Sequence, residues 1–220
     1  MKKNLLIFCR VIFVLLAMFA ATYFALRFYY VSQSKQAIEK SLDLTQSPAP
    51  IVGNETNPFP IVEFFDYRCP HCSTLSKIMM DAVGDDLQST TKIILRPTAV
   101  VDEQSYLIGT LVLALDNQKK GESAAVHQEI MALTDVPTYD TVKAMVQARG
   151  LDVEQAEKDA ENLKDVIAKN TALGYEIGFP SVPALVIGDK GYVPFKTMPG
   201  INELRLMMID AKTRLQIPKQ

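Results

Sequence analysis

Residues 64–72 read FFDYRCPHC, which places a C-x-x-C pair between an apolar segment and a helix-like one. The apolar run Ile61 to Phe65 predicts a buried strand, and Pro70 suits the first helical position, where a missing backbone N–H is not needed. Two sulfurs in the first turn of a helix can close a disulfide with little backbone movement. The Cys69 thiol also faces the unpaired N–H groups of that turn, which favour its anion. This stretch therefore predicts thiol–disulfide exchange.

The cysteine count supports a chemical role for this pair. The chain has three cysteines, Cys9, Cys69 and Cys72, whereas a disulfide-stapled secreted scaffold carries more of them, spread along the chain. A structural zinc site needs four ligands, and only His71, His127 and Cys9 are available to join the pair. His71 lies between the two cysteines and is poorly placed to share their metal, so no metal site is predicted.

The charge of the chain argues against nucleic acid as a partner. Residues 1–31 hold four basic residues and no acidic one. The rest of the chain has 19 basic against 25 acidic residues and therefore a net charge of −6. A mildly acidic domain offers no basic surface for a phosphate backbone.

The N-terminal segment, residues 1–31, predicts a transmembrane signal anchor. The run Val11 to Leu26 and its flanks reach the roughly 20 residues that span a bilayer as a helix. A cleaved signal peptide is the alternative, with its best small-residue site near Ala20 and Ala21. Basic residues on the two sides are nearly balanced, so the positive-inside rule does not decide the orientation. Cys9 is interpreted as a packing residue within or beside the membrane.

Three regions are expected. After the anchor, residues 32–58 are interpreted as a spacer with a short amphipathic helix, which is either a solvated stalk or a self-association element. Residues 59–220 form the folded domain, whose predicted order is strand, helix, strand, a helical block over about 101–177, a hairpin and a closing helix. Gly84 is expected to end the first helix. The hairpin is expected to pair residues 183–187 with 192–195 across a Gly-Asp-Lys-Gly turn.

From about Pro50 onward, this order and three motifs resemble the DsbA family of periplasmic thiol oxidoreductases. The motifs are VEFFDY at residues 62–67, CPHC at 69–72 and VPALVIG at 182–188. The resemblance implies an α/β class, a thioredoxin fold with an inserted helical domain. It implies that Cys69 is the exposed nucleophile and Cys72 the buried resolving thiol. His71 and Pro70 lie between them, and the His71 imidazole is expected to stabilise the Cys69 thiolate.

The resemblance also assigns roles outside the cysteine motif. Pro183 matches the family's cis-proline beside the disulfide, and Val182 is expected to pair with extended substrate; an ordinary trans proline is the alternative. Glu63 matches a buried carboxylate that accepts the Cys72 proton, against the alternative of a surface residue. Asp66 is expected to end or cap the strand. For Arg68, a functional positive charge and an ordinary surface charge are equally expected. His127 is expected to be solvated.

The function expected from these residues is oxidation of cysteine pairs in exported proteins through a Cys69–Cys72 disulfide. The domain is expected in the periplasm, anchored in the inner membrane, or soluble there after signal cleavage. A DsbB-like membrane protein is expected to restore the disulfide, with no bound cofactor. One alternative is an isomerase or reductase of the ScsC or DsbC kind. Another is a metal-binding or chaperone module on the same fold, although the sequence shows no Met or His cluster around the pair.

Overall fold

The computed structural model describes residues 2–43, 49–194 and 197–217, with the backbone alone for residues 2–9 and 11. Its centre is a five-stranded sheet in the order β1-β3-β2-β4-β5. The strands are β1 (Ile51–Gly53), β2 (Phe59–Phe65), β3 (Thr91–Pro97), β4 (Ala184–Ile187) and β5 (Lys190–Tyr192). Strands β2 and β3 are parallel, and the other neighbours are antiparallel.

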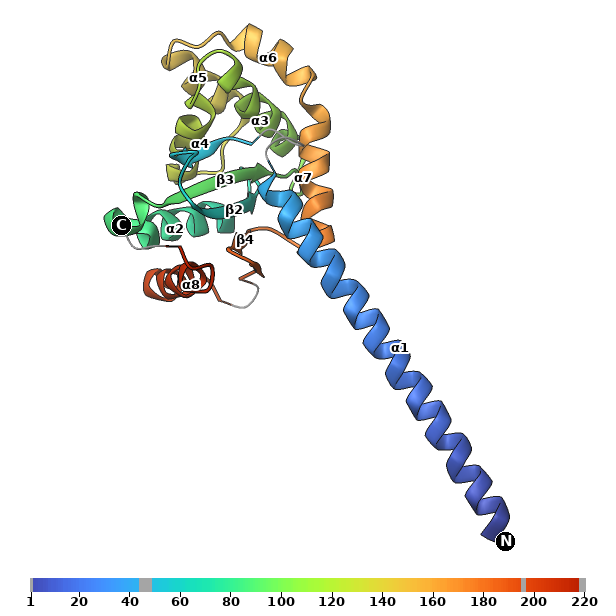
Figure 1. The fold of residues 1–220 in the computed structure, drawn as a ribbon. Helices are drawn as coiled ribbons and strands as arrows, with labels where there is room; N and C mark the ends of the chain where they lie inside the picture. Colours follow the sequence, from blue (N-terminus) through green and yellow to red (C-terminus); the bar gives the residue numbers. More distant parts are fainter. Residues whose placement is uncertain (1, 44–48, 195–196, 218–220) are drawn as a thin grey trace.

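Helices cover both faces of this sheet, and an inserted group of helices lies beyond one side of it (Figure 1). The helices are α1 (Lys2–Leu42), α2 (Pro70–Gln88), α3 (Glu103–Ala114), α4 (Glu122–Ala132), α5 (Tyr139–Ala148), α6 (Val153–Glu161), α7 (Lys164–Ile177) and α8 (Ile201–Arg214), with a 3-10 turn at Leu115–Asn117. The predicted helical block at 101–177 corresponds to α3 through α7. The architecture is the predicted thioredoxin fold with a helical insertion.

Alternation along the strands sorts their side chains between two apolar clusters. On β2, Ile61 and Phe65 join the larger cluster with α2, α4 and α8, whereas Val62 and Phe64 join the smaller one with α7 and the end of α1. Successive strand residues point to opposite faces, so Glu63 lies on the larger-cluster face. In the same way, Arg96 on β3 follows Ile94 to the smaller-cluster face. Two ionisable side chains are thus buried on opposite sides of one sheet.

One boundary agrees with the expectation and one differs from it. Gly84 adopts the non-helical backbone angles φ 51° and ψ −178°, so the first helical segment of α2 ends there as expected, and a second segment continues to Gln88 after the kink. The hairpin turn is shorter than expected. Gly188, at φ 65°, and Asp189 connect β4 directly to β5, so Lys190 and Gly191 are strand residues. Of the second strand expected at 192–195, residue 195 lies outside the described residues.

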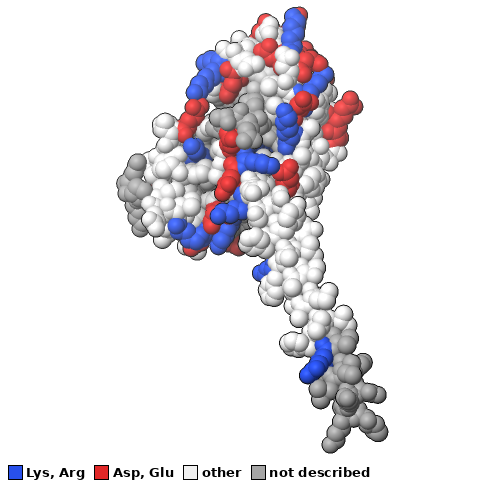
Figure 2. All heavy atoms as spheres, turned by 45° about the vertical axis from the view of Figure 1, so that its right-hand side comes forward, with Lys and Arg blue, Asp and Glu red and all other residues white. Residues whose placement is uncertain are grey.

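Helix α1 is a single 41-residue helix that projects far beyond the domain (Figure 1). Its stretch Ile12–Leu42 is long and apolar enough to cross a membrane, and no part of its most apolar window is buried. In the view of Figure 2, charged side chains gather on the domain, whereas the described part of the projecting helix is mostly uncharged. This pattern agrees with the predicted apolar N-terminal segment.

The expected spacer at residues 32–58 is partly wrong, because its two ends belong to the folded domain. Ala37 and Ser41 on the last turns of α1 are fully buried against α7 and the smaller apolar cluster. Residues 51–53 form β1, which pairs with β3. The Arg96 guanidinium donates to the backbone carbonyls of Ser41 at 3.0 Å and Asp43 at 3.2 Å, which end the helix. A cation at the carboxyl end of a helix is favoured by the unpaired carbonyls there.

Candidate active site

The two cysteines of the C-x-x-C motif lie at the start of α2 in different environments. Cys69 is the N-cap residue of the helix and is partly exposed, whereas Cys72 is fully buried. Pro70 occupies the first helical turn, as predicted. Both residues are free thiols in this structure, which therefore represents the reduced form. The buried sulfur of Cys72 accepts a hydrogen bond from the Asp66 backbone N–H at 3.4 Å.

The surroundings favour the anion of Cys69. The Cys72 thiol donates to the Cys69 sulfur, and the backbone N–H groups of Cys72 and His71 point to it as well. Together they outweigh partial burial and the charge of Asp66, and they lower the pKa of Cys69 from 9.0 to about 6. Burial, the hydrogen bond to Cys69 and the negative charge of that sulfur raise the pKa of Cys72 far above its usual range. One sulfur is therefore an anion at neutral pH and the other a thiol.

His71 is exposed, and it stabilises the Cys69 anion through its backbone N–H. Within the described part of the chain its imidazole makes no hydrogen bond to Cys69. The role expected for the imidazole stays a prediction for the reacting enzyme.

Asp66 and Arg68 hold the loops around the cysteines. The buried Asp66 carboxylate accepts from the backbone N–H groups of Arg68 and Val100, both at 2.8 Å. The Arg68 guanidinium donates to Asp102 at 2.7 Å and to the Pro137 carbonyl at 2.5 Å. Asp66 ends β2 as expected, and Arg68 cross-links loops of the insertion to the active-site turn.

Glu63 lies on the larger-cluster face of β2, three residues before Asp66, and is fully buried. The surface alternative is therefore wrong. Within the described part of the chain, neither of its carboxylate oxygens has a partner at normal hydrogen-bond geometry. Burial raises the pKa of this carboxyl from 4.5 to about 8, and the nearby Ser76 hydroxyl offsets only part of that rise. Its charge in turn helps to raise the pKa of Cys72, so the two groups interact.

The expectation that His127 is solvated is wrong. Its ring is 2% exposed and packs edge to face against Phe65 and Tyr67, with ring centroids 4.7 and 5.8 Å away. Its Nε2 lies 3.8 Å from Oε2 of Glu63, and its Nδ1 has no hydrogen-bond partner. Burial lowers the pKa of this imidazole to about 3, so the ring is neutral.

Helical spacing contained a signal for this burial. His127 follows Ala124 by three residues and precedes Met131 by four, which places all three on the buried side of α4. The polar neighbours of His127 in sequence, including Gln128, lie on other faces. A test of the histidine against the apolar positions of its own helix would have shown that it faces the core.

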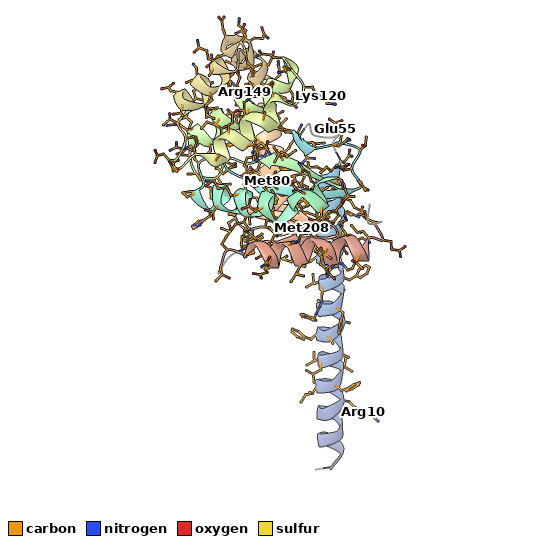
Figure 3. The ribbon with its side chains drawn as sticks, turned by 90° about the vertical axis from the view of Figure 1, so that its left-hand side faces the viewer. Arg10, Glu55, Met80, Lys120, Arg149 and Met208 are labelled. Atoms are coloured by element: carbon orange, nitrogen blue, oxygen red, sulfur yellow. The ribbon has the colours of Figure 1, made fainter. Side chains whose placement is uncertain are left out.

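A cavity of about 380 Å³ lies beside Glu63 and His127. Its walls include Ser76 of α2 and Gln128 of α4. Three methionines also line it, Met79, Met80 and Met131, and Met80 is labelled on α2 in Figure 3. This cavity lining does not include Cys69 or Cys72. Among the described residues, no group of three or more His, Cys, Asp or Glu side chains is arranged to hold a metal ion.

The Val182–Pro183 peptide bond is cis, as expected, and Pro183 directly precedes β4. The register pairs Ala184 with Phe64, so Pro183 lies beside the end of β2, where the active-site turn begins. Val182 contributes to a shallow groove together with Val100 and Tyr175, which are 45% and 60% exposed. An apolar surface thus lies beside Val182 and the end of β2.

Comparisons with known proteins agree with this fold. A family model described as thioredoxin matches residues 45–204. A thioredoxin-like oxidoreductase from Silicibacter pomeroyi DSS-3 has a TM-score of 0.65 and 28% identity, over 80% of this chain and 96% of its own. The thiol-disulfide exchange protein alpha-DsbA2 from Wolbachia pipientis has a TM-score of 0.70 and 22% identity, over 84% and 97%. The catalytic domain of Proteus mirabilis ScsC has a TM-score of 0.68 and 18% identity, over 81% and 98%.

No curated protein matches the chain. The family match covers most of the folded domain, and the cysteine pair, the buried carboxyl and the cis-proline lie together at one end of its central strands. The chain therefore belongs to the thioredoxin family, and its fold is similar to those of solved thiol-disulfide oxidoreductases.

Proposed function

We propose that this protein is a disulfide oxidase that introduces disulfides into exported proteins. The observation that carries the proposal is the contrast between an accessible Cys69 anion and a buried, protonated Cys72. With a pKa of about 6, roughly nine tenths of Cys69 is thiolate at pH 7. A stabilised thiolate makes the reduced enzyme more favourable, so its disulfide is a stronger oxidant.

The reaction begins with the Cys69–Cys72 disulfide. A substrate thiolate attacks the partly exposed Cys69 sulfur, the bond to Cys72 breaks, and a mixed disulfide forms. Cys72 leaves as a thiolate in a buried site that disfavours charge, and it takes a proton from Glu63. A second substrate thiolate then attacks the substrate sulfur of the mixed disulfide and releases Cys69 as the favoured anion.

Substrate is proposed to bind along the groove at Val182. The backbone beside the cis-proline pairs with an extended chain, and exposed Val100 and Tyr175 accept apolar side chains. Unfolded or reduced exported proteins present both features. The substrate dithiol gives up two electrons to the Cys69–Cys72 disulfide, so the step needs no bound cofactor.

The protein is proposed to act outside the cytoplasm as an uncleaved membrane-anchored enzyme. Support comes from the long apolar helix that continues without interruption into the folded domain and is held there by Arg96. Reoxidation is assigned to a DsbB-like membrane protein, which is reached in the same bilayer. N-terminal sequencing of the protein from membranes tests the anchor, since cleavage near Ala20 removes the first residues.

The oxidase proposal is tested by a redox titration of the full chain and by oxidation of a reduced, unfolded protein. An oxidase is expected to have a potential near or above about −180 mV, and Cys69→Ser abolishes oxidation. A potential near about −270 mV, or a stable oligomer that reshuffles scrambled disulfides, supports a reductase or isomerase instead.

The cysteine contrast has its own test in thiolate absorbance. A titration of the reduced protein is expected to show a midpoint near pH 6 from Cys69. Cys72→Ala removes the strongest hydrogen bond to that sulfur and raises the midpoint by about one unit or more, whereas Cys72→Ser keeps an O–H donor and raises it less. Equal midpoints in all three proteins contradict the proposed role of the Cys72 thiol.

A further inference from the structure

Glu63 needs a route to solvent if it supplies protons to Cys72 in each turnover. The carboxyl is fully buried, and among the described residues neither of its oxygens has a partner at normal hydrogen-bond geometry. His127, which is contributed by α4 of the inserted helical domain, has its Nε2 3.8 Å from Oε2 of this carboxyl. The thioredoxin core and the insertion thus meet at this pair.

The two imidazole nitrogens face different surroundings. Nε2 lies 3.8 Å from Oε2 of Glu63, about 0.8 Å farther than in a normal hydrogen bond. A small side-chain rotation brings the two atoms into hydrogen-bond distance. Nδ1 is buried and unpartnered. Both side chains line the cavity of about 380 Å³, which is roomy enough for several water molecules and has polar groups to bind them.

We propose that His127 is a positioning residue that passes protons between cavity water and Glu63, so that the inserted domain controls protonation of the buried Cys72. This inference rests on the proposed role of Glu63 in thiol exchange. It assigns a part in the reaction to a residue outside the thioredoxin core.

The proton balance closes over one catalytic cycle. When the disulfide opens, Cys72 takes the proton of Glu63, Glu63 takes one from Nε2, and Nδ1 takes one from water. The imidazole therefore stays neutral and changes only its tautomer. When the enzyme is reoxidised, Cys72 loses its proton, the same transfers run in reverse, and the original tautomer returns. A neutral ring suits the low pKa that burial gives His127, and a protonated carboxyl suits the raised pKa of Glu63.

Apart from the Ser76 hydroxyl beside Glu63, the groups around the ring are poorly placed to carry protons between the cavity and this carboxyl. Tyr67 packs on the imidazole, but its pKa is raised well above 10 by burial and by the charge of Glu63. Lys77 and Asp81 of α2 line the cavity from exposed positions. Strands β1 and β3 contribute only the apolar side chains Val52, Ile93 and Leu95 to the cavity wall.

The test uses the oxidised full chain in detergent and a reduced dithiol peptide in single-turnover mixing from pH 5 to 9. His127→Ala is expected to slow the opening of the disulfide about 10- to 100-fold. Added imidazole enters the enlarged cavity and restores the rate. 1-Methylimidazole does not, because the relay needs two exchangeable nitrogens.

Met131→Ala is the matched control, since it enlarges the same cavity from the same helix without removing a proton carrier. Its rate is expected to be independent of imidazole. Every variant is first checked for the Cys69 titration near pH 6, which reports a folded active site. If His127→Ala does not fold, His127→Gln keeps a polar side chain and is expected to show the same loss of rate.

The outcomes separate this inference from the proposed function. Wild-type rates in His127→Ala or His127→Gln at every pH, beside an active wild type, overturn the relay and leave the oxidase proposal standing. Equal rescue by imidazole and 1-methylimidazole also overturns it, because filling the cavity then suffices. A wild type that does not oxidise the peptide contradicts the oxidase proposal itself.

Discussion

Two buried ionisable side chains on neighbouring strands of one sheet have opposite surroundings and, as a result, different roles. Arg96 on β3 pairs in register with Phe64, and Glu63 is the residue before it on β2. Arg96 faces the end of α1 and is surrounded by carbonyl acceptors, including those of Ser41 and Asp43. Glu63 faces α2 and α4, and within the described residues its oxygens have no partner at normal hydrogen-bond geometry. A buried charge that keeps its hydrogen-bond partners stabilises the contact between α1 and the sheet. A buried ionisable group without such partners is available for proton transfer.

The pKa values express the same contrast. Burial lowers the pKa of Arg96 to about 10, against the charge of Asp43, so the guanidinium stays charged at neutral pH. Burial raises the pKa of Glu63 to about 8, so this carboxyl is mostly neutral and titrates close to the working range. The charge on the side of the sheet that packs against α1 is thus fixed at neutral pH, whereas the carboxyl on the cysteine side titrates near the working range.

The largest expected effect on stability comes from replacing Arg96, on the side of the sheet that packs against α1. Arg96→Met keeps an apolar side chain but leaves the carbonyls at the end of α1 without their donor. We expect the free energy of unfolding to fall by about 3–5 kcal/mol, measured by urea denaturation of the full chain in detergent. Arg96→Lys restores one cation and is expected to lose less. The Cys69 titration of the folded fraction stays near pH 6, because Arg96 lies on the other face; a shift of that midpoint contradicts the separation of the two faces.

The second-largest effect comes from removing the ionisable carboxyl of Glu63. The folded-state pKa of Glu63 lies above its unfolded value, so its stabilising contribution is complete below about pH 4.5 and is lost as pH rises towards 8. Relative to the wild type, Glu63→Gln is therefore expected to gain about 3 kcal/mol of unfolding free energy between pH 4 and pH 7. Denaturation curves at several pH values measure this difference.

The exposed Glu103→Gln is the control for that comparison, because its side chain is solvated in both states. The Glu63→Gln and wild-type curves converge at low pH if the carboxyl is the cause. A constant offset between them at all pH values contradicts a raised pKa at residue 63. Slower thiol exchange in the same variant, despite its greater stability, is the mark of a residue retained for chemistry.

Local signals were sufficient to predict one of these two faces. The apolar run before the cysteines, Pro70 at the helix start and Pro183 before a buried strand each act within a few residues, and the structure has the strand, the helix and the cis bond where they were expected. The burial of Glu63 followed from the resemblance and not from its strand pattern, which fits either face.

The other face depends on contacts distant in sequence. Arg96 looks like an ordinary exposed arginine until the end of α1 packs over it, more than 50 residues away along the chain. The docking face of α1 consists of small or partly buried residues such as Ala37, Ser41 and Ile38, too short a stretch to distinguish from a solvated stalk. The contact between His127 and Glu63 is of the same kind, because periodicity places His127 on the buried side of α4 but does not show that this side meets Glu63.

The smallest expected effect lies at the same joint as Arg96, on its outer surface. Lys40 of α1 and Glu176 of α7 form an ion pair at 3.2 Å, and their side chains are 52% and 53% exposed. Exposed pairs gain little, because water screens the charges and two long side chains lose freedom. Glu176→Gln is therefore expected to change the unfolding free energy by less than about 0.5 kcal/mol, and by less still at high salt. Urea denaturation of Glu176→Gln and Arg96→Met under the same conditions measures the largest and the smallest expected losses of stability in one experiment. A loss from Glu176→Gln as large as that from Arg96→Met means that surface charge holds α1 to the domain, and that the burial of Arg96 has no special part in this contact.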